Sequence, residues 1–297
     1  MPENKWAELR RALIQKLRKE GVREGMPFNA EIALAKYLES KLMHAAKIYQ
    51  PSLTQGKKCR FLDCLRIVWN SYTANTFFVD DPLIQKVYPE VCKPITFHME
   101  AEIDRVQAWV ESHDAYLGMH ICIGILEQAT TDEDFRKNLV AIISRVYHEC
   151  DHIYFPSHTA EIDTIKKRML YQMDEAEIRA FSKQIAYLYF SILPGKPFSY
   201  DTFKDYIIKH CSADKEYYLI QFLEFFKNPS ETPFKKREAI EFAEEVTMGQ
   251  HPEFTKDTLS RTFRLYMQYI TLFVAYLNQT KEIEDAGEVP DYMKEVL

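Results

Sequence analysis

The stretch TTDEDFRKNLVAIISRVYHECDH, residues Thr130–His152, decides much of the fold predicted for this chain. It opens with two threonines and three acidic residues, which cap a helix start and complement the helix dipole. Apolar residues then recur at three- and four-residue spacing as far as Val146, the pattern of an amphipathic helix. Pro156 follows, and a proline forces the residue before it out of the helical region. We therefore expect one long helix that carries His148–His152 at its end.

The run His148–His152 reads HECDH and matches the pattern HExxH. Residues four apart lie one above the other on a helix, so the two histidines would present their imidazoles to one point. A zinc ion bridges such a pair, and Glu149 would accept a proton from water as the catalytic base. Catalytic zinc takes three protein ligands. We therefore expect His148, His152 and His158 as metal ligands.

Four further side chains are candidates to orient a ligating histidine or to replace one of the ligands. They are Glu111, His113, Asp151 and Glu161. Glu111 and His113 are candidates because we interpret residues 95–127 as helical. An antiparallel hairpin of that segment with residues 132–155 would place Glu111 level with His148. The sequence identifies no residues that would bind an organic cofactor.

Two metalloenzyme families carry similar motifs. HECDH together with His158 resembles the extended pattern HExxHxxGxxH of the metzincins, with Phe155 at the position of that family's glycine. HECDH is also similar to the metal-binding helix of peptide deformylases, HExDH, in which two histidines and a cysteine hold the metal and the glutamate is the base. The deformylases' glycine-rich loop and EGCxS strand are absent. Both resemblances imply His148 and His152 as ligands and Glu149 as base.

Iron is an alternative to zinc, because the same histidines occur in another set of spacings. His98–Glu102, His148–His152 and His158–Asp163 resemble the local spacings of hemerythrin-like di-iron sites, which occur in four-helix bundles. Glu149 and His152 also match the ExxH of ferritin-like carboxylate sites. These resemblances imply a di-iron helical protein.

The composition indicates a helical protein. Only 8 glycines occur in 297 residues, which argues against glycine-rich phosphate loops and turn-rich β sandwiches. Hydrophobic residues make up 46% and recur mostly at helical spacing. The predicted fold is all-α, a multi-helix bundle of about eleven helices with no significant β-sheet. Residues 1–194 would form a helical domain that carries HExxH, and residues 195–297 would form an aromatic-rich helical subdomain. The alternative is that the chain forms one continuous domain.

Charge and cysteine usage limit the classes of partner. The net charge of −6 disfavours nucleic acid, and no apolar run reaches the roughly 20 residues that a membrane span needs. Six scattered cysteines and the absence of an apolar leader favour the cytoplasm. Aromatic residues at helical spacing in 217–273 would, if exposed, serve a protein partner or a homo-oligomer.

Three functions follow from the sequence. The first is a zinc-dependent hydrolase that acts on a peptide or amide bond in a peptide or protein substrate. The second is a non-enzymatic helical protein for protein interaction or regulation. The third is a hemerythrin-like or ferritin-like di-iron protein.

Overall fold

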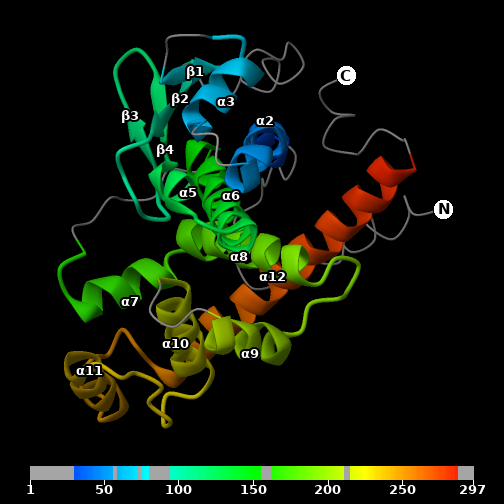
Figure 1. The fold of residues 1–297 in the computed structure, drawn as a ribbon. Coiled ribbons are helices and arrows are strands. Elements are labelled where there is room, and N and C mark those ends of the chain that lie inside the picture. The colour runs from blue at the N-terminus through cyan, green and yellow to red at the C-terminus, as the bar shows by residue number, and fades with distance from the viewer. Residues whose placement is uncertain are drawn as a thin grey trace.

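The structure is a computed structural model that describes residues 30–55, 59–71, 75–79, 94–154, 162–210 and 215–286. These ranges contain ten helices and four strands (Figure 1). The helices are α2 (Ala30–Gln55), α3 (Phe61–Val68), α5 (Gly124–Gln128), α6 (Asp132–Tyr154), α7 (Ile165–Met173), α8 (Glu175–Ile192), α9 (Tyr200–His210), α10 (Lys215–Lys227), α11 (Arg237–Thr247) and α12 (Lys256–Asp285). The strands are β1 (Thr76–Phe78), β2 (Ile95–Glu100), β3 (Ala108–Ser112) and β4 (Leu117–Cys122).

The four strands form one mixed sheet in the order β1-β2-β4-β3. β2 and β4 run parallel, with Phe97 opposite Met119, while β1 and β3 pair antiparallel at the two outer positions. Among the described residues, β3 therefore pairs on one side only, with β4. Its other edge is the one that reaches the candidate site described below.

The prediction of an all-α fold of about eleven helices without a significant sheet is wrong. Residues 95–127, interpreted as helical, form β2, β3, β4 and α5 instead. The alternation typical of strands is present in ITFHME (95–100) and LGMHIC (117–122), where every second residue is apolar. Each run is only six residues long. Within a chain full of three- and four-residue spacings, such short runs fit a helical pattern equally well.

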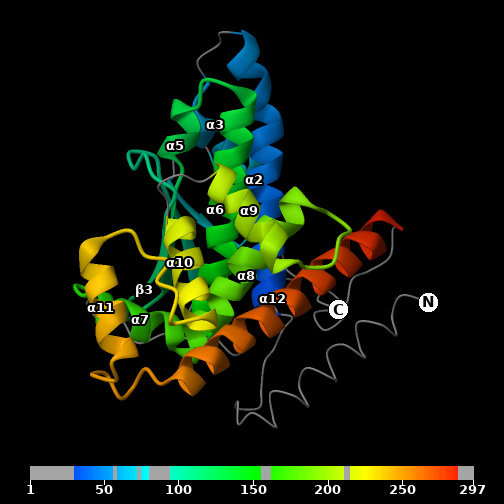
Figure 2. The same cartoon turned by 90° about the horizontal axis from the view of Figure 1, so that it is seen from below.

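The α6 helix lies at the centre of the fold. It packs against the sheet through β3 and β4, against α2 along its length, and against α8 on the far side (Figures 1 and 2). The inner face of the sheet carries apolar residues that are each at most 3% exposed. They are Ile95, Phe97, Met99, Met119 and Ile121.

Side-chain caps fix the starts of two helices, and the cap of α6 follows the predicted pattern. The Thr131 hydroxyl accepts a hydrogen bond from the Asp134 amide at 3.0 Å, so α6 begins where the acidic run predicts. The Asp174 carboxylate likewise accepts one from the Ala176 amide at 2.9 Å and fixes the start of α8. These caps fix the residues at which α6 and α8 begin.

The C-terminal helices pack through aromatic residues. α12 lies along α8, α10 packs against α12, and α11 packs against α7. Most residues of the predicted aromatic stripes are at most 2% exposed. They are Phe222, Phe225, Phe226, Tyr266, Tyr269 and Phe273. These six side chains form core; the protein partner, the homo-oligomer and the domain boundary after residue 194 stay predictions.

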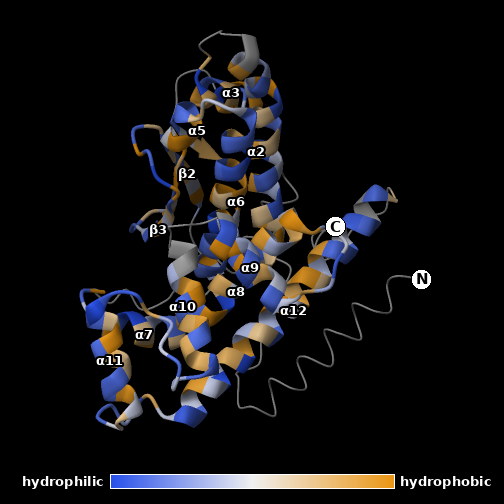
Figure 3. Cartoon of the chain, turned by 60° about the horizontal axis from the view of Figure 1, so that its bottom comes forward, coloured by the Kyte–Doolittle hydropathy of each residue, from blue (hydrophilic) through white to orange (hydrophobic). Residues whose placement is uncertain are grey.

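Both hydrophilic and hydrophobic residues occur around most helices (Figure 3). Even α12, the longest described helix with 30 residues, carries charged residues in its first and last turns. Across the described ranges, no helix combines the length and the apolar character required to cross a membrane.

Candidate metal centre

The His148 and His152 imidazoles meet on one face of α6. Their Nε2 atoms lie 3.0 Å apart. Both side chains are largely buried, with 5% and 10% of their surface exposed. Two nitrogen lone pairs repel at this distance, so a proton or a cation must lie between them. The structure thus brings together two of the three predicted ligands.

Glu177 of α8 is the third group at this point. Its Oε2 lies 3.6 Å from His148 Nε2, and its Oε1 lies 3.3 Å from His152 Nε2. The side chain is fully buried, where an ionised carboxylate is stable only beside a cation or strong hydrogen-bond donors. One ligand atom from each of the three residues lies within 4.8 Å of the others. The group could hold a metal ion.

The Glu177 carboxylate controls the protonation of its neighbours. Burial alone would lower the pKa of His152, but hydrogen bonding and charge from Glu177 outweigh it and raise that pKa to about 9. Burial, and then the charge of Glu177, raises the pKa of the Tyr171 hydroxyl far above its usual value. Without a metal, the raised pKa favours the protonated form of His152 beside Glu177 at neutral pH.

Glu149 lies beside the histidine pair, as the motif predicts for a catalytic base. Its Oε1 is 4.0 Å from His148 Nε2, and the residue is 9% exposed. It lines the same cavity as both histidines. The carboxylate is therefore close to the two histidines and also within reach of a molecule in the cavity.

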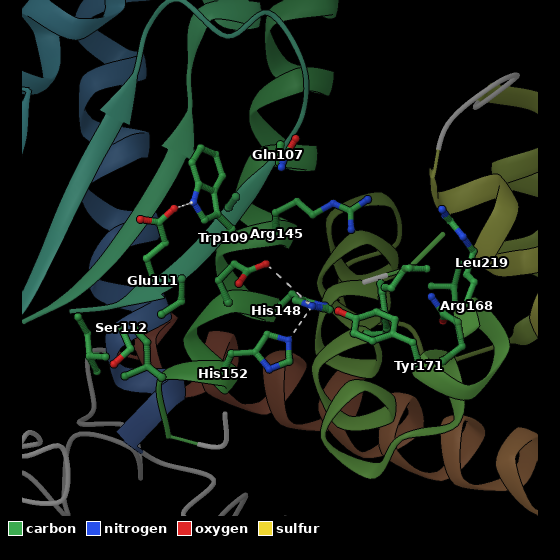
Figure 4. A pocket seen from close by; sticks show the side chains of 18 of the residues that line it. Gln107, Trp109, Glu111, Ser112, Arg145, His148, His152, Arg168, Tyr171 and Leu219 are labelled. Atoms are coloured by element: carbon green, nitrogen blue, oxygen red, sulfur yellow. Dashed lines mark hydrogen bonds and ion pairs between the residues drawn. The ribbon is translucent and has the colours of Figure 1, made fainter. Parts of the chain in front are cut away.

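The cavity in front of these groups has a volume of about 1010 Å³. Residues 107–113, along the free edge of β3, form one wall, and α7 and α10 contribute to the opposite wall. Figure 4 shows Trp109 and Glu111 on the β3 side, the histidine pair in the middle, and Tyr171 and Arg168 on the other side. The histidines and Glu149 thus lie between two walls that come from distant parts of the chain.

The structure places the remaining candidate residues as follows. Glu111 and His113 line the cavity, but on the β3 side rather than on a helix paired with α6. Glu111 accepts a hydrogen bond from Trp109 Nε1 at 2.8 Å and lies 3.5 Å from His113 Nε2. The helical hairpin that placed Glu111 level with His148 does not exist. His158 and Glu161 lie outside the described residues.

Asp151 belongs to a buried ion-pair network. Its Oδ2 accepts a hydrogen bond from Arg179 Nε at 2.7 Å, and its Oδ1 accepts one from Lys183 Nζ. Lys183 also donates to Glu31 of α2 at 2.7 Å. All four residues are at most 6% exposed. Asp151 thus joins α6 to α8 and does not lie in the His148–His152–Glu177 group.

The two carboxylates of the network differ in the direction of their pKa shifts. Burial raises the pKa of a carboxyl, but the charges of Lys183 and Arg179 outweigh it and hold the pKa of Asp151 below its usual value. Glu31 has only Lys183 as a partner in the network, so burial prevails and its pKa is raised. Asp151 is therefore the firmly ionised carboxylate to which the two cations are anchored.

One pair of the di-iron alternative, His98–Glu102, does not lie on a helix. His98 lies on β2, where its ring nitrogens contact the Thr76 and Thr96 hydroxyls at 3.1 and 2.9 Å. Its ring stacks on His120 of β4. Glu102 follows β2 in a turn, and its side chain is 95% exposed. The His98–Glu102 pair therefore lies on the sheet, outside the His148–His152–Glu177 group.

Comparisons with known proteins leave the geometry as the main evidence. No protein-family model, no curated protein and no solved structure matches the chain.

Sequence reasoning missed Glu177, although the helix pattern held a signal for it. Glu177 follows His152 by 25 residues, a separation at which no local spacing rule applies. It lies on the apolar stripe of α8 that also carries Phe181 and Ile185, at i+4 and i+8. Phe181 packs on the His148 ring at 4.4 Å between centroids. A carboxylate on the apolar face of a helix is the sequence feature that could have identified Glu177.

The Asp151 network makes a prediction about stability. Asp151→Ala leaves Lys183 and Arg179 buried without their carboxylate, so we expect the free energy of unfolding to fall by about 3–5 kcal/mol. Denaturant unfolding followed by circular dichroism measures the loss. Asp163→Ala, which removes an exposed carboxylate paired with Lys167, should leave the transition nearly unchanged. Equal effects of the two substitutions would contradict the role given to the network.

The pKa of His152 makes a prediction about pH in the metal-free protein. The folded-state pKa of about 9 lies above the ordinary value of 6.5, so protonation of His152 stabilises the fold. This contribution, about 3 kcal/mol, is complete below pH 6.5 and disappears as the pH rises through 9. Chelator-treated wild type should therefore lose more stability between pH 6.5 and 9 than His152→Gln. Parallel pH profiles for the two proteins would contradict the raised pKa.

Proposed function

We propose that this protein is a metal-dependent hydrolase of peptide or amide bonds, with zinc held by His148, His152 and Glu177. The observation that carries the proposal is the meeting of these three groups beside a cavity, with Glu149 next to them. Glu177 takes the place that the sequence prediction gave to His158.

The donor set fits zinc. Two imidazole nitrogens and one carboxylate oxygen are a ligand set of catalytic zinc sites, which keep a fourth position for water or substrate. Zn–N bonds of about 2.0–2.1 Å in a tetrahedral site place two nitrogens about 3.3 Å apart. The 3.0 Å between His148 and His152 is close to that value. The buried Glu177 carboxylate supplies negative charge that offsets the charge of the cation.

Glu149 is the group that moves protons in the proposed reaction. Zinc held by these three residues would polarise the substrate carbonyl and lower the pKa of water. Glu149 accepts a proton from the water as the water oxygen bonds to the carbonyl carbon. It then donates that proton to the leaving nitrogen as the C–N bond breaks. The Tyr171 hydroxyl, which its raised pKa keeps protonated, lines the same cavity and hydrogen-bonds to the proposed ligand Glu177.

Metal content is the first test. We expect about one equivalent of zinc per chain by plasma mass spectrometry after zinc supplementation and dialysis. Glu177→Ala and the double variant His148→Ala/His152→Ala should lose the metal, because each removes ligands. His113→Ala should retain it, because His113 lines the cavity outside the ligand group. Wild-type protein without metal would contradict the proposal.

The second test separates binding from chemistry. Glu149→Gln keeps the size of the side chain but removes the base, so we expect zinc to stay bound and peptide hydrolysis to fall about 10²–10⁴-fold. Cleavage of a fluorogenic peptide library measures the loss. Glu133→Gln, at an exposed position in the first turn of the same helix, is the matched control. Undiminished cleavage by Glu149→Gln would exclude Glu149 as the base.

A further inference from the structure

Two cysteines meet at the start of α3. The Sγ atoms of Cys59 and Cys64 lie 3.5 Å apart, in contact but not joined by a bond. Figure 1 shows α3 beside α2 and away from α7 and α10, and neither cysteine lines the cavity. The pair therefore belongs to a different part of the molecule from the candidate metal centre.

The local sequence explains why the two thiols meet. Arg60 is the N-cap residue of α3, so Cys59 is the residue before the cap and Cys64 is the fourth residue of the helix. Side chains at these two positions contact each other across the first turn of a helix, an arrangement known as the hydrophobic staple. In α3 both positions of the staple hold a thiol. The contact is therefore a consequence of helix formation.

The two thiols differ in exposure. Cys59 is partly exposed, whereas Cys64 is fully buried. The first residue of α3 holds this buried side in the core, because the Phe61 ring packs against Tyr49 of α2 and Phe135 of α6, with centroids 5.5 and 5.8 Å apart. A reagent in solution therefore reaches Cys59 and does not reach Cys64.

Cys64 is also a poor nucleophile toward a dissolved reagent. Burial, and then the contact with Cys59, raises the pKa of Cys64 to about 12. Since the thiolate is the nucleophile, Cys64 reacts roughly 10³-fold more slowly at neutral pH than an ordinary thiol. A sulfur held in contact with it offsets this factor, because oriented neighbours reach effective concentrations of the order of 10⁵ M. Cys64 is therefore suited to react with Cys59 alone.

We infer that Cys59 and Cys64 are a redox-active pair, which a small disulfide such as glutathione disulfide oxidises to an intramolecular disulfide. The Cys59 sulfur attacks one sulfur of the small disulfide, whose S–S bond breaks. One thiol leaves with the Cys59 proton, and a mixed disulfide remains on Cys59. Cys64 then attacks the Cys59 sulfur, and the second thiol leaves with the Cys64 proton. Two protein thiols are oxidised, and one small disulfide is reduced to two thiols.

The disulfide makes the staple of α3 covalent. The N-cap residue Arg60 makes no capping hydrogen bond with its side chain. The Leu62 amide instead donates to the Glu127 carboxylate of α5 at 3.3 Å. The start of α3 thus depends on another helix, and a covalent link across its first turn would support it from within.

Peptide mapping tests whether the disulfide forms. Folded wild-type protein is incubated with glutathione disulfide, the remaining thiols are alkylated, and the protein is digested with trypsin. Cleavage after Lys58, Arg60 and Arg66 separates the cysteines, so the disulfide joins peptide 59–60 to peptide 61–66. We expect this linked pair, and its loss when dithiothreitol is added before alkylation. Both peptides without any linked pair would overturn the inference.

Single variants test the order of the two steps. Cys64→Ala removes the second thiol, so the mixed disulfide with glutathione should persist on Cys59. Cys59→Ser leaves only the buried thiol, which should react on the order of 10³-fold more slowly than Cys59 does in Cys64→Ala. Equal rates in the two variants, each folded by circular dichroism, would overturn these roles. The wild-type mapping decides the inference even if a variant does not fold.

Hydrogen exchange measures the effect on the fold. We expect the α3 amides to exchange roughly tenfold more slowly in the oxidised protein than in the reduced protein. The first turn of α8, which Asp174 caps, is the internal control and should exchange equally in both. Equal exchange of α3 in the two forms would overturn the support that the disulfide gives to this helix. None of these measurements uses the metal or the cavity, so their outcome is independent of the proposed function.

Discussion

The buried ion pairs of Asp151 with Arg179 and Lys183 fix how α6 meets α8. An interface of apolar side chains alone tolerates small slips between helices, because one apolar contact replaces another at little cost. A buried carboxylate has no such freedom, since any slip would leave it without its cations. Asp151 lies within the HExxH run, and the two cations follow Glu177 on α8. The interaction that sets the helix register therefore also sets the position of Glu177 against the histidine pair.

The Asp151 network also explains how the fold tolerates the buried His148–His152–Glu177 group, which is unfavourable without a cation. Glu177 is fully buried, and in the metal-free protein the proton on His152 is what balances its charge. In the Asp151 network, by contrast, each of the two carboxylates accepts a hydrogen bond from a cationic side chain of the protein itself. The network can hold α6 and α8 together whether or not a cation occupies the candidate centre. Metal binding would then require the release of the His152 proton, without rearrangement of the helices.

The parts of the structure that the sequence predicted are those that depend on neighbours within one element. The start of α6 at the Thr131 cap and the shared face of His148 and His152 follow from helix geometry, which acts over four residues. The sheet was missed although ITFHME at 95–100 alternates as a strand does, because a six-residue run is too short to distinguish period 2 from period 3.6 in a helical chain. Its strands are recognised only through their pairing with each other.

Glu177 shows the same limit at the level of the site. The sequence prediction looked for the third ligand near the motif and chose His158, because spacing rules describe ligands on one helix and the turn that follows it. Glu177 reaches the site through the packing of a second helix, whose position depends on contacts that residue spacing does not encode. The sequence does contain one indication of Glu177. A glutamate on an otherwise apolar helix face is buried on folding and therefore needs a cationic partner inside the fold. A search for charged residues on apolar stripes, paired with a search for histidines four apart, would have identified both halves of the centre.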